Sequence, residues 1–155
     1  MSASADKQEL VSVNVTRLDK YRFEVDFGDG LERAFADEPA PLGEGTAPSP
    51  VQWLASAVAN CLAASMVFAF ARYREDVGAL QTAVTCEIGR NDKGRLRVIG
   101  LDAQLTLGRD PDSLEHLEPV LRSFADFCTV SKSVEAGIPL RIAVKAEDGR
   151  VLKQA

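Results

Sequence analysis

The sequence predicts an α+β fold, and three patterns carry this prediction. Apolar and polar residues alternate in several short segments, as they do in half-buried strands. An uncharged segment at residues 51–71 is long enough for a buried helix, and residues 112–136 contain further helical signals. The expected order of elements is βββ-α-ββ-αα-β, in which sheets flank two principal helices.

The first three strands are expected to be short and consecutive. Residues 10–18 alternate between aliphatic and polar side chains, and residues 21–27 alternate between apolar and charged side chains. A Gly-Asp-Gly sequence at residues 28–30 is typical of a hairpin turn, so residues 31–36 are expected to return as a third strand.

A loop rich in proline and glycine, residues 37–50, leads into the first helix. Loops of this length are often functional, and a plain crossover is the simpler alternative. Ser49 is a capping residue type and Pro50 suits the first helical turn, so the helix is expected to run from there to about Arg74. Its many alanines leave a shallow surface, against which another helix could pack closely.

The uncharged helix is also long enough to span a bilayer. Polar residues at near-helical spacing (Gln52, Ser56, Asn60 and Ser65) speak against a lipid-facing helix. We therefore expect no membrane association. A helix buried on nearly all sides in a small domain indicates a partner subunit.

The second half of the chain predicts two strands, two helices and a last strand. Residues 80–88 and 95–107 are strand-like and are joined by a polar turn. A helix is expected to open near Asp112, and Pro119 should kink or restart it. A short third helix follows, and residues 140–146 form the final strand.

Length and charge bound the class of protein. The chain has 155 residues, so we expect a flexible tail at residues 1–9 and a single domain at residues 10–155. The net charge of -5 argues against nucleic acid and anionic membranes as partners. The first residues lack the basic and apolar stretches of a secretory signal, so the cytoplasm is the expected compartment.

Three cysteines are the main candidates for chemistry. Cys61 lies in the middle of the uncharged helix, where it is either an inert core residue or a shielded nucleophile. Cys128 lies where one predicted helix ends and the next begins, so backbone N–H groups of the following helix are expected to point at its sulfur. Cys86 lies in a predicted strand and is interpreted as core. In a reducing compartment, any disulfide would be transient.

Cys61 needs a nearby cation if it is to react as a thiolate. It lies about three turns into its helix, beyond the reach of the helix dipole, and apolar neighbours raise a thiol pKa. A free thiol is only about 3% ionised at pH 7, and lowering its pKa to about 6 requires roughly 3 kcal/mol. Arg22 and Arg33, which flank the first hairpin, are the first candidates, and Arg17 is the third. On local grounds alone, Cys128 ionises more easily.

A metal centre or a histidine-based catalytic site is not expected. The cysteines lack the short paired spacing of structural zinc sites. The single histidine, His116, lies between Glu115 and Glu118 and is interpreted as part of a solvated helix face. No glycine-rich phosphate motif is present, so no cofactor is expected.

Two segments together resemble the OsmC/Ohr family of thiol-dependent hydroperoxide reductases. These are APSPVQWLASAVANCLAAS at residues 47–65 and FCTVSKSVEAGIPLRIAV at residues 127–144. The resemblance covers most of the chain. It implies an intertwined homodimer, in which long cysteine-bearing helices pack at the centre between sheets of both chains.

The resemblance also implies chemistry. Cys61 matches the cysteine that attacks the peroxide and becomes a sulfenic acid. Cys128 matches the cysteine that condenses with it to a disulfide, which a dithiol then reduces. Apolar residues along these segments would suit a bulky organic hydroperoxide: Trp53, Leu54, Met66, Phe68, Phe124 and Phe127.

Two positions depart from the pattern of the family. A glutamate that holds the catalytic arginine is expected directly after the Ser-Pro pair, and this sequence has Val51 there. Glu44, or a carboxylate of Asp37 and Glu38, is the candidate replacement. Thr129 follows the second cysteine, where proline is common in the family.

Three functions follow, in order of preference. The first is a homodimeric hydroperoxide reductase of oxidative-stress defence that uses Cys61 and Cys128. The second is a non-catalytic dimer that binds a small apolar or thiol-bearing ligand, which the presence of Val51 favours. The third is a cysteine-dependent hydrolase or transferase, for which His116 would be the only histidine base.

Overall fold

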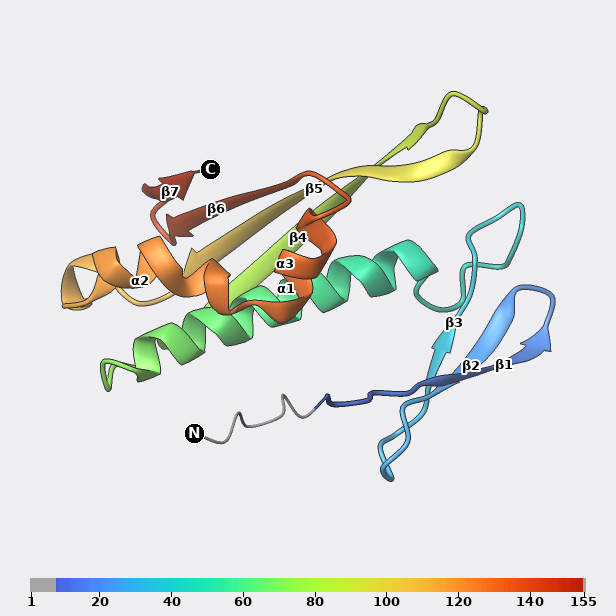
Figure 1. The fold of residues 1–155 in the computed structure, drawn as a ribbon, viewed down its shortest axis with the longest axis horizontal. Coiled ribbons are helices and arrows are strands. Elements are labelled where there is room, and N and C mark those ends of the chain that lie inside the picture. Colours follow the sequence, from blue (N-terminus) through green and yellow to red (C-terminus); the bar gives the residue numbers. More distant parts are fainter. Residues whose placement is uncertain (1–7, 155) are drawn as a thin grey trace, which may run out of the picture. The chain divides into compact units, whose positions relative to one another are not determined.

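The structure is a computed structural model that describes residues 8–154. It divides into two compact units, Met1–Pro50 and Val51–Ala155, and each is described by itself. The predicted α+β class is confirmed: the described residues form two sheets and three α-helices (Figure 1). Most of the expected tail lies outside the described residues, and the single domain over residues 10–155 stays a prediction.

The first unit contains one antiparallel sheet of strands β1 (Asn14–Asp19), β2 (Arg22–Asp26) and β3 (Ala34–Ala36). The predicted hairpin turn is present, and residues 28–30 all adopt positive φ angles. Strands β1 and β3 are shorter than the segments predicted from the sequence, residues 10–18 and 31–36. Residues before Asn14 and before Ala34 have no partner in the strand ladder, which begins only where two strands lie opposite each other.

The long loop after β3 is ordered by one buried carboxylate. Asp37 is only 3% exposed and accepts hydrogen bonds from the backbone N–H of Glu38, Glu44 and Thr46 and from the Thr46 hydroxyl. These bonds, led by that of the Thr46 N–H, lower the pKa of Asp37. A side chain at Gly43 would overlap Asp37 and the Glu38 carbonyl oxygen. The predicted loop is therefore a compact structure with a closely packed backbone.

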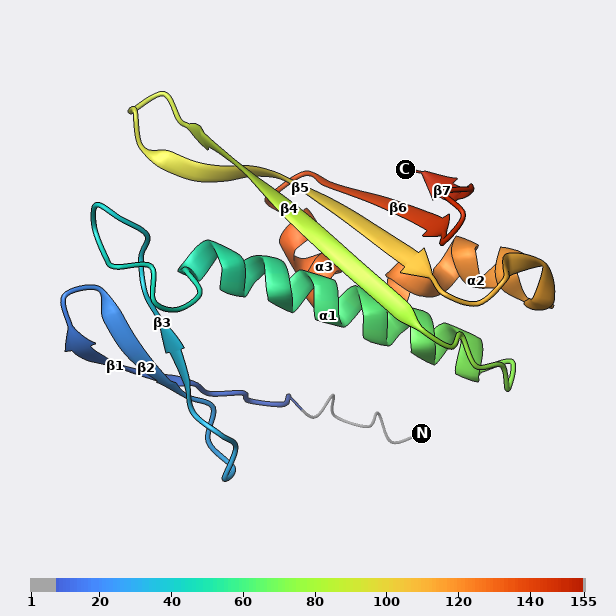
Figure 2. The same cartoon turned by 180° about the vertical axis from the view of Figure 1, so that it is seen from behind.

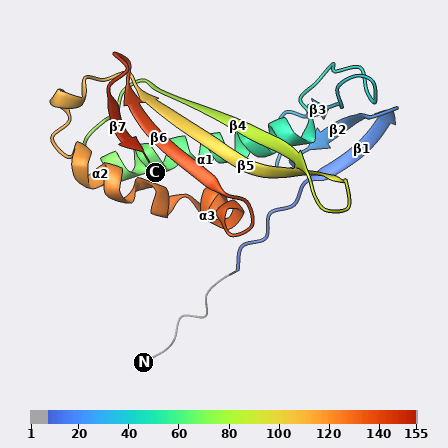
Figure 3. The same ribbon diagram turned by 90° about the horizontal axis from the view of Figure 1, so that it is seen from above.

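The second unit packs helices on one face of a four-stranded sheet, as Figures 2 and 3 show. The strand order is β4-β5-β6-β7, with β5 and β6 parallel and the other pairs antiparallel. The helices α2 and α3 lie on the connection that makes β5 and β6 parallel. The elements are α1 (Pro50–Ala71), β4 (Leu80–Arg90), β5 (Leu96–Leu107), α2 (Leu117–Ser123), α3 (Thr129–Glu135), β6 (Leu140–Ala146) and β7 (Val151–Gln154).

The core of this unit lies between α1 and the sheet. In β5, buried Leu101, Ala103 and Leu105 alternate with exposed Asp102 and Gln104, which gives the sheet one apolar and one polar face. A buried stripe at helical spacing on α1 completes the core: Val58, Leu62, Met66, Ala69 and Phe70.

By length and composition alone, helix α1 is long and apolar enough to cross a membrane. Its buried stripe nevertheless belongs to the same cluster as residues of β5, α2 and β6. The opposite side of α1 includes Val67 and Phe68, which are 50% and 53% exposed. Within the second unit, therefore, α1 is a core helix with one apolar face still uncovered.

Three details differ from the sequence prediction. Strand β7 was not expected, because it has only four residues and little alternation. Pro119 does not kink a longer helix, since it lies in the first turn of α2, where its missing N–H costs nothing. Separate 3-10 turns, η1 (Pro111–Ser113) and η2 (Phe124–Phe127), precede and follow α2.

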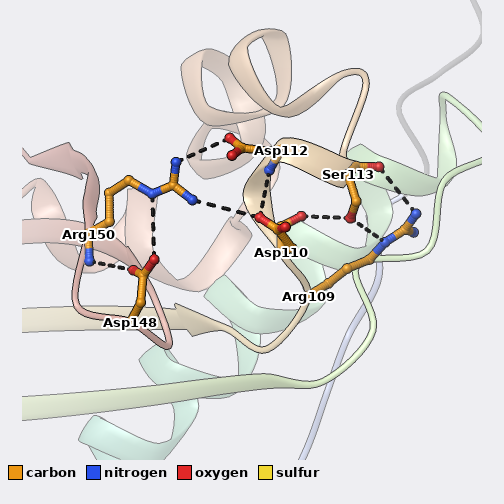
Figure 4. A network of polar contacts seen from close by, with 6 residues as sticks. All are labelled: Arg109, Asp110, Asp112, Ser113, Asp148 and Arg150. Carbon is orange, nitrogen blue, oxygen red and sulfur yellow. Dashed lines mark hydrogen bonds and ion pairs between the residues drawn. The ribbon is translucent and has the colours of Figure 1, made fainter.

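A polar network joins η1 to the turn between β6 and β7 (Figure 4). The guanidinium of Arg150 lies 3.1 Å from Asp112, 3.7 Å from Asp110 and 3.8 Å from Asp148. Arg109 donates to the Ser113 hydroxyl at 3.1 Å. One arginine therefore balances three carboxylates and ties the start of the helical connection to the end of the sheet.

Candidate active site

Cys61 and Cys128 come together at the beginning of α3. The backbone N–H of Val130 donates to the Cys61 sulfur at 3.5 Å, and the N–H of Ser131 donates to the Cys128 sulfur at 3.4 Å. These two N–H groups are adjacent in the chain, so the two thiols share one helix terminus. The N–H groups predicted to serve Cys128 are thus present, and the same helix terminus also serves Cys61, which sequence reasoning missed.

The local sequence explains how α3 presents these groups. Cys128 is the residue before the helix, with extended backbone angles of φ -85° and ψ 99°, and its sulfur takes the place of a capping oxygen. The first N–H groups of a helix have no intrahelical acceptor. In this structure, two of them are satisfied by thiols, one from the capping residue Cys128 and one from Cys61 of α1.

The two thiols differ in access. Cys128 is fully buried, whereas Cys61 is half-buried and lines a pocket of about 440 Å³. A bound molecule in this pocket would meet Cys61, whereas Cys128 is enclosed by the core. The two thiols therefore differ in access, although both sulfurs accept similar hydrogen bonds.

The surroundings of Cys61 favour the neutral thiol. Burial is the main cause that raises the pKa of Cys61, and the hydrogen bond with Cys128 raises it further. The N–H groups of Val130 and Ser131 oppose this shift without reversing it. This agrees with the expectation that a cation from another element is needed to make Cys61 a thiolate.

The pocket beside Cys61 is apolar and aromatic. It is lined by Ala64, Ser65, Phe68 and Phe127 in addition to the cysteine. The rings of Phe68 and Phe127 meet edge to face, with centroids 5.2 Å apart. The guanidinium of Arg72 stacks on the Phe127 ring, 5.1 Å from the ring centroid.

The predicted substrate-binding residues fall into different places. Phe127 lines the pocket, while Met66 and Phe124 are fully buried in the core of the second unit. Trp53 and Leu54 are half-buried near the start of α1 and are not among the residues that line the pocket. Ala64 and Ser65 were missed, although their spacing of three and four residues from Cys61 places them on its face of the helix.

The predicted arginines lie in the first unit, and Cys61 lies in the second. Arg33 pairs with Glu24 at 2.5 Å and with Asp26 at 3.5 Å. Arg22 stacks over the Phe35 ring at 4.9 Å. The assignment of either arginine to Cys61 stays a prediction.

The carboxylates suggested as replacements for the missing glutamate have partners within the first unit. Both oxygens of Asp37 accept hydrogen bonds from the loop that it orders. Glu44 pairs with Lys20 at 2.6 Å. Arg33, in contrast, already has its own carboxylate in Glu24. The arginine therefore has a partner that does not depend on the residue at position 51.

Cys86 packs against the hydrophobic core of the second unit, as predicted, and its burial raises the pKa of its thiol. Its sulfur lies 4.0 Å from the carbonyl oxygen of Val51 at the start of α1. This contact is separate from the pair at α3. Cys86 is therefore a matched internal control for experiments on the other two thiols.

His116 does not lie on a solvated helix face, which corrects the sequence interpretation. It precedes α2, where its ring stacks on Tyr73 at 4.3 Å and its Nδ1 atom lies 3.4 Å from Glu75. Donor atoms of Glu75, Glu115 and His116 lie within 4.8 Å of one another. Both Glu75 oxygens already accept backbone N–H groups, those of Glu115 and His116, so this carboxylate acts as a link from the α1 exit to α2.

The fold and the site define a class: an α+β protein in which two thiols meet at a helix N-terminus beside an apolar pocket. The chain matches the family described as OsmC-like protein over residues 43–143. It belongs to this family, as the two resembling segments suggested. None of the curated proteins compared with the sequence matches it.

Solved structures share the fold at low sequence identity. A protein from Psychrobacter arcticus 273-4, described as an osmotic stress induced and detoxification response protein, is 19% identical with a TM-score of 0.73, covering 90% of this chain and 99% of that one. An organic hydroperoxide resistance protein from Elizabethkingia anophelis is 12% identical with a TM-score of 0.73, covering 92% and 100%. One from Legionella pneumophila is 15% identical with a TM-score of 0.70, covering 90% and 99%.

Proposed function

We propose that this protein reduces organic hydroperoxides with thiol chemistry as part of a defence against oxidative stress. The observation that carries the proposal is the placement of Cys61 and Cys128 at adjacent N–H groups of one helix terminus, with the more exposed cysteine lining an apolar pocket. Two thiols at one helix terminus are suitably placed to act as a pair. The names of the hydroperoxide resistance proteins that share the fold support the same function.

The reaction begins at Cys61. Its thiolate attacks the distal peroxide oxygen, the O–O bond breaks, and the leaving alkoxide takes a proton to become an alcohol. Cys61 is then a sulfenic acid. The Cys128 sulfur attacks the Cys61 sulfur, water leaves, and a disulfide forms. A dithiol returns both cysteines to the reduced state and is itself oxidised to a disulfide.

The Val130 and Ser131 N–H groups assist this sequence without being sufficient for it. They favour negative charge on sulfur, yet the pKa of Cys61 remains raised. The proposal therefore includes an arginine, with Arg22 and Arg33 as candidates. It also includes a homodimer in the cytoplasm, in which the partner subunit covers the apolar outer face of α1.

Turnover of cumene hydroperoxide with a dithiol reductant tests the proposal. We expect the wild type to consume the peroxide and Cys61→Ser to abolish consumption. Assayed without the dithiol, Cys128→Ser should reduce one equivalent and accumulate the Cys61 sulfenic acid, because no second thiol of the protein resolves it. Cys86→Ser serves as the matched control and should keep wild-type turnover. Unchanged turnover in Cys61→Ser would refute the proposal.

A second candidate function is a non-catalytic dimer that binds a small apolar or thiol-bearing ligand. The raised pKa of Cys61 favours it, because a neutral thiol is a poor nucleophile. It accounts equally for the apolar pocket. The pH dependence of Cys61 alkylation, described below, separates the two candidates.

A further inference from the structure

We infer that Glu75, Glu115 and His116 form a binding site for one divalent transition metal ion, of the class that Zn²⁺ represents. The inference is independent of the proposed peroxide chemistry and uses none of its residues. One donor atom from each of the three side chains lies within 4.8 Å of the other two. Ions of this class bind imidazole nitrogen and carboxylate oxygen at about 2.0–2.2 Å.

Glu75 is held in place by the turn that follows α1. Its backbone N–H donates to the Phe70 carbonyl oxygen at 3.2 Å, and its side chain is only 15% exposed. The carboxylate accepts the N–H of Glu115 at 2.8 Å and the N–H of His116 at 3.1 Å. Each carboxylate oxygen has a second lone pair, so these bonds orient Glu75 and still leave it able to coordinate an ion. Carboxylates that bind metals in proteins are themselves hydrogen-bonded in this way.

His116 offers a nitrogen whose position fits a shared ion. Its Nδ1 atom is buried and makes no hydrogen bond within the described part of the chain, although it lies 3.4 Å from Oε2 of Glu75. Two ligands at about 2.1 Å from a tetrahedral zinc ion are about 3.4 Å apart. The ring is fixed by stacking on Tyr73, with centroids 4.3 Å apart and planes inclined by 16°. An ion between Nδ1 and Glu75 would therefore satisfy a nitrogen that is otherwise without a partner.

Glu115 supplies the third ligand from the exposed side. Its backbone is fixed by the bond to Glu75, while its side chain is exposed and can rotate toward an ion. Two ionised carboxylates balance the charge of a divalent ion, and three protein ligands leave the remaining coordination positions to water. Glu115 also separates the metal site from a plain contact between His116 and Glu75, because that contact does not need the Glu115 carboxylate.

A metal ion at this site would fasten the end of α1 to the start of α2. Glu75 and Glu115 are 40 positions apart in the sequence, and all three ligands belong to the second unit. Such ligands lack the short paired spacing of the common zinc motifs, so the sequence alone did not indicate them. The site appears only where the two ends of this long connection meet.

Isothermal titration calorimetry with Zn²⁺ measures the affinity of the site. Thiolates also bind Zn²⁺, so the full-length protein with all three cysteines replaced by serine is the background for every variant. Glu115→Gln and His116→Gln each remove one ligand, and the exposed position of Glu115 makes its variant the one least able to disturb the fold. Glu118→Gln is the matched control, because it neutralises an exposed carboxylate three residues further along.

We expect one Zn²⁺ per chain. Glu115→Gln should weaken binding at least tenfold and His116→Gln roughly a hundredfold, since even partners of metal ligands contribute about ten- to a hundredfold to affinity. Glu118→Gln should leave the affinity within about twofold, because its side chain is not a ligand. Equal affinities of the Glu115→Gln and Glu118→Gln proteins would overturn the inference, as would a folded background protein that binds no Zn²⁺.

Amide NMR spectra with Co²⁺ locate the ion in the wild-type protein, which keeps its cysteines. Co²⁺ takes the same ligands as Zn²⁺, and its unpaired electrons broaden the signals of nearby amides. We expect the signals of Glu115 and His116 to broaden at one equivalent, and Glu115→Gln to prevent this broadening. Broadening confined to Val130 and Ser131, whose N–H groups lie beside the thiols, would assign metal binding to the cysteines and contradict the inference.

Discussion

The backbone N–H of Val130 donates a hydrogen bond to the sulfur of Cys61 at 3.5 Å, although the two residues are 69 positions apart in the sequence. This bond connects α1 to the first turn of α3. It places the thiol at the positive end of a second helix rather than under the influence of its own. The reactivity of Cys61 therefore depends on the groups that lie beside this contact between α1 and α3.

Unless a cation reaches Cys61, its alkylation should remain slow at neutral pH and increase as the pH rises. Burial and the bond to Cys128 raise the pKa of Cys61, so the midpoint should lie above the value of about 8.5 for a free thiol. Iodoacetamide labelling from pH 6 to pH 10, followed by mass spectrometry of the Cys61 peptide, measures this midpoint. Glutathione labelled in the same solutions is the reference.

A midpoint near pH 6 would show that a cation reaches the sulfur in solution, as the reductase proposal requires. A midpoint above that of glutathione would favour the non-catalytic function instead.

Phe127→Ala should reduce selectivity for bulky peroxides. Phe127 lines the pocket and is 37% exposed, so only the exposed part of its surface is available to contact a ligand. We expect kcat/KM for cumene hydroperoxide to fall roughly fivefold, while that for hydrogen peroxide stays near the wild-type value. A parallel loss for both substrates would mean that the variant disturbs the adjacent Cys128 rather than the binding of the apolar group.

Ala59→Glu should disrupt the proposed homodimer. Ala59 lines a shallow pocket of about 430 Å³ with other small residues of α1 and with Thr82 and Val84 of β4. A carboxylate buried there by a partner subunit would cost about 3 kcal/mol or more, which is more than a hundredfold in Kd. Light scattering coupled to gel filtration measures the change in mass.

Ala83→Glu is the control for this change. Ala83 is exposed on the sheet, where it lines a different pocket from that of Ala59, so its variant should keep the wild-type mass. A monomeric wild type, or an Ala59→Glu variant with an unchanged dimer mass, would contradict the proposed interface.

Asp37→Asn should destabilise the protein at neutral pH and matter less in acid. Because hydrogen bonds from Thr46 and neighbouring amides lower the pKa of Asp37, its stabilising contribution is present above the ordinary carboxyl pKa of about 3.9. The contribution is lost as the pH falls through the lowered pKa. Urea unfolding midpoints of wild type and variant should therefore differ at pH 7 and converge at the acid end.

Asp92→Asn provides the comparison for this experiment. Asp92 is exposed in the turn between β4 and β5, so its replacement should leave the midpoint nearly unchanged at every pH. A gap between wild type and Asp37→Asn that widened toward low pH would contradict the proposed role of the ionised carboxylate.

Arg150→Met should weaken the attachment of η1 to the sheet. The variant leaves the carboxylates of Asp110, Asp112 and Asp148 without their shared cation. The arginine side chain is 45% exposed, so the expected loss is about 1 kcal/mol or less at low salt, and it should decrease in high salt. Arg122→Met, which removes an exposed pair with Glu118, should have a smaller effect. Equal losses in the two variants would show that the network adds nothing beyond a single surface pair.

Local patterns were sufficient to predict most elements of the fold. Strand alternation, the Gly-Asp-Gly turn and the uncharged helix each depend on residues near one another, and each is confirmed. Strand β7 was missed because its four residues form a strand only beside β6. The position of His116 was misjudged for a similar reason: its stacking partner, Tyr73, lies in a distant turn.

The site shows the same division. By itself, the sequence determined which residues can do chemistry: Cys61 in an apolar helix and Cys128 before a helix, in a chain of the OsmC-like family. Only the tertiary structure decided that the two thiols share one helix terminus, that Cys61 lines a pocket and that Val130 donates to its sulfur. Pairing, burial and access depend on contacts between segments far apart in the chain, and no local pattern encodes them.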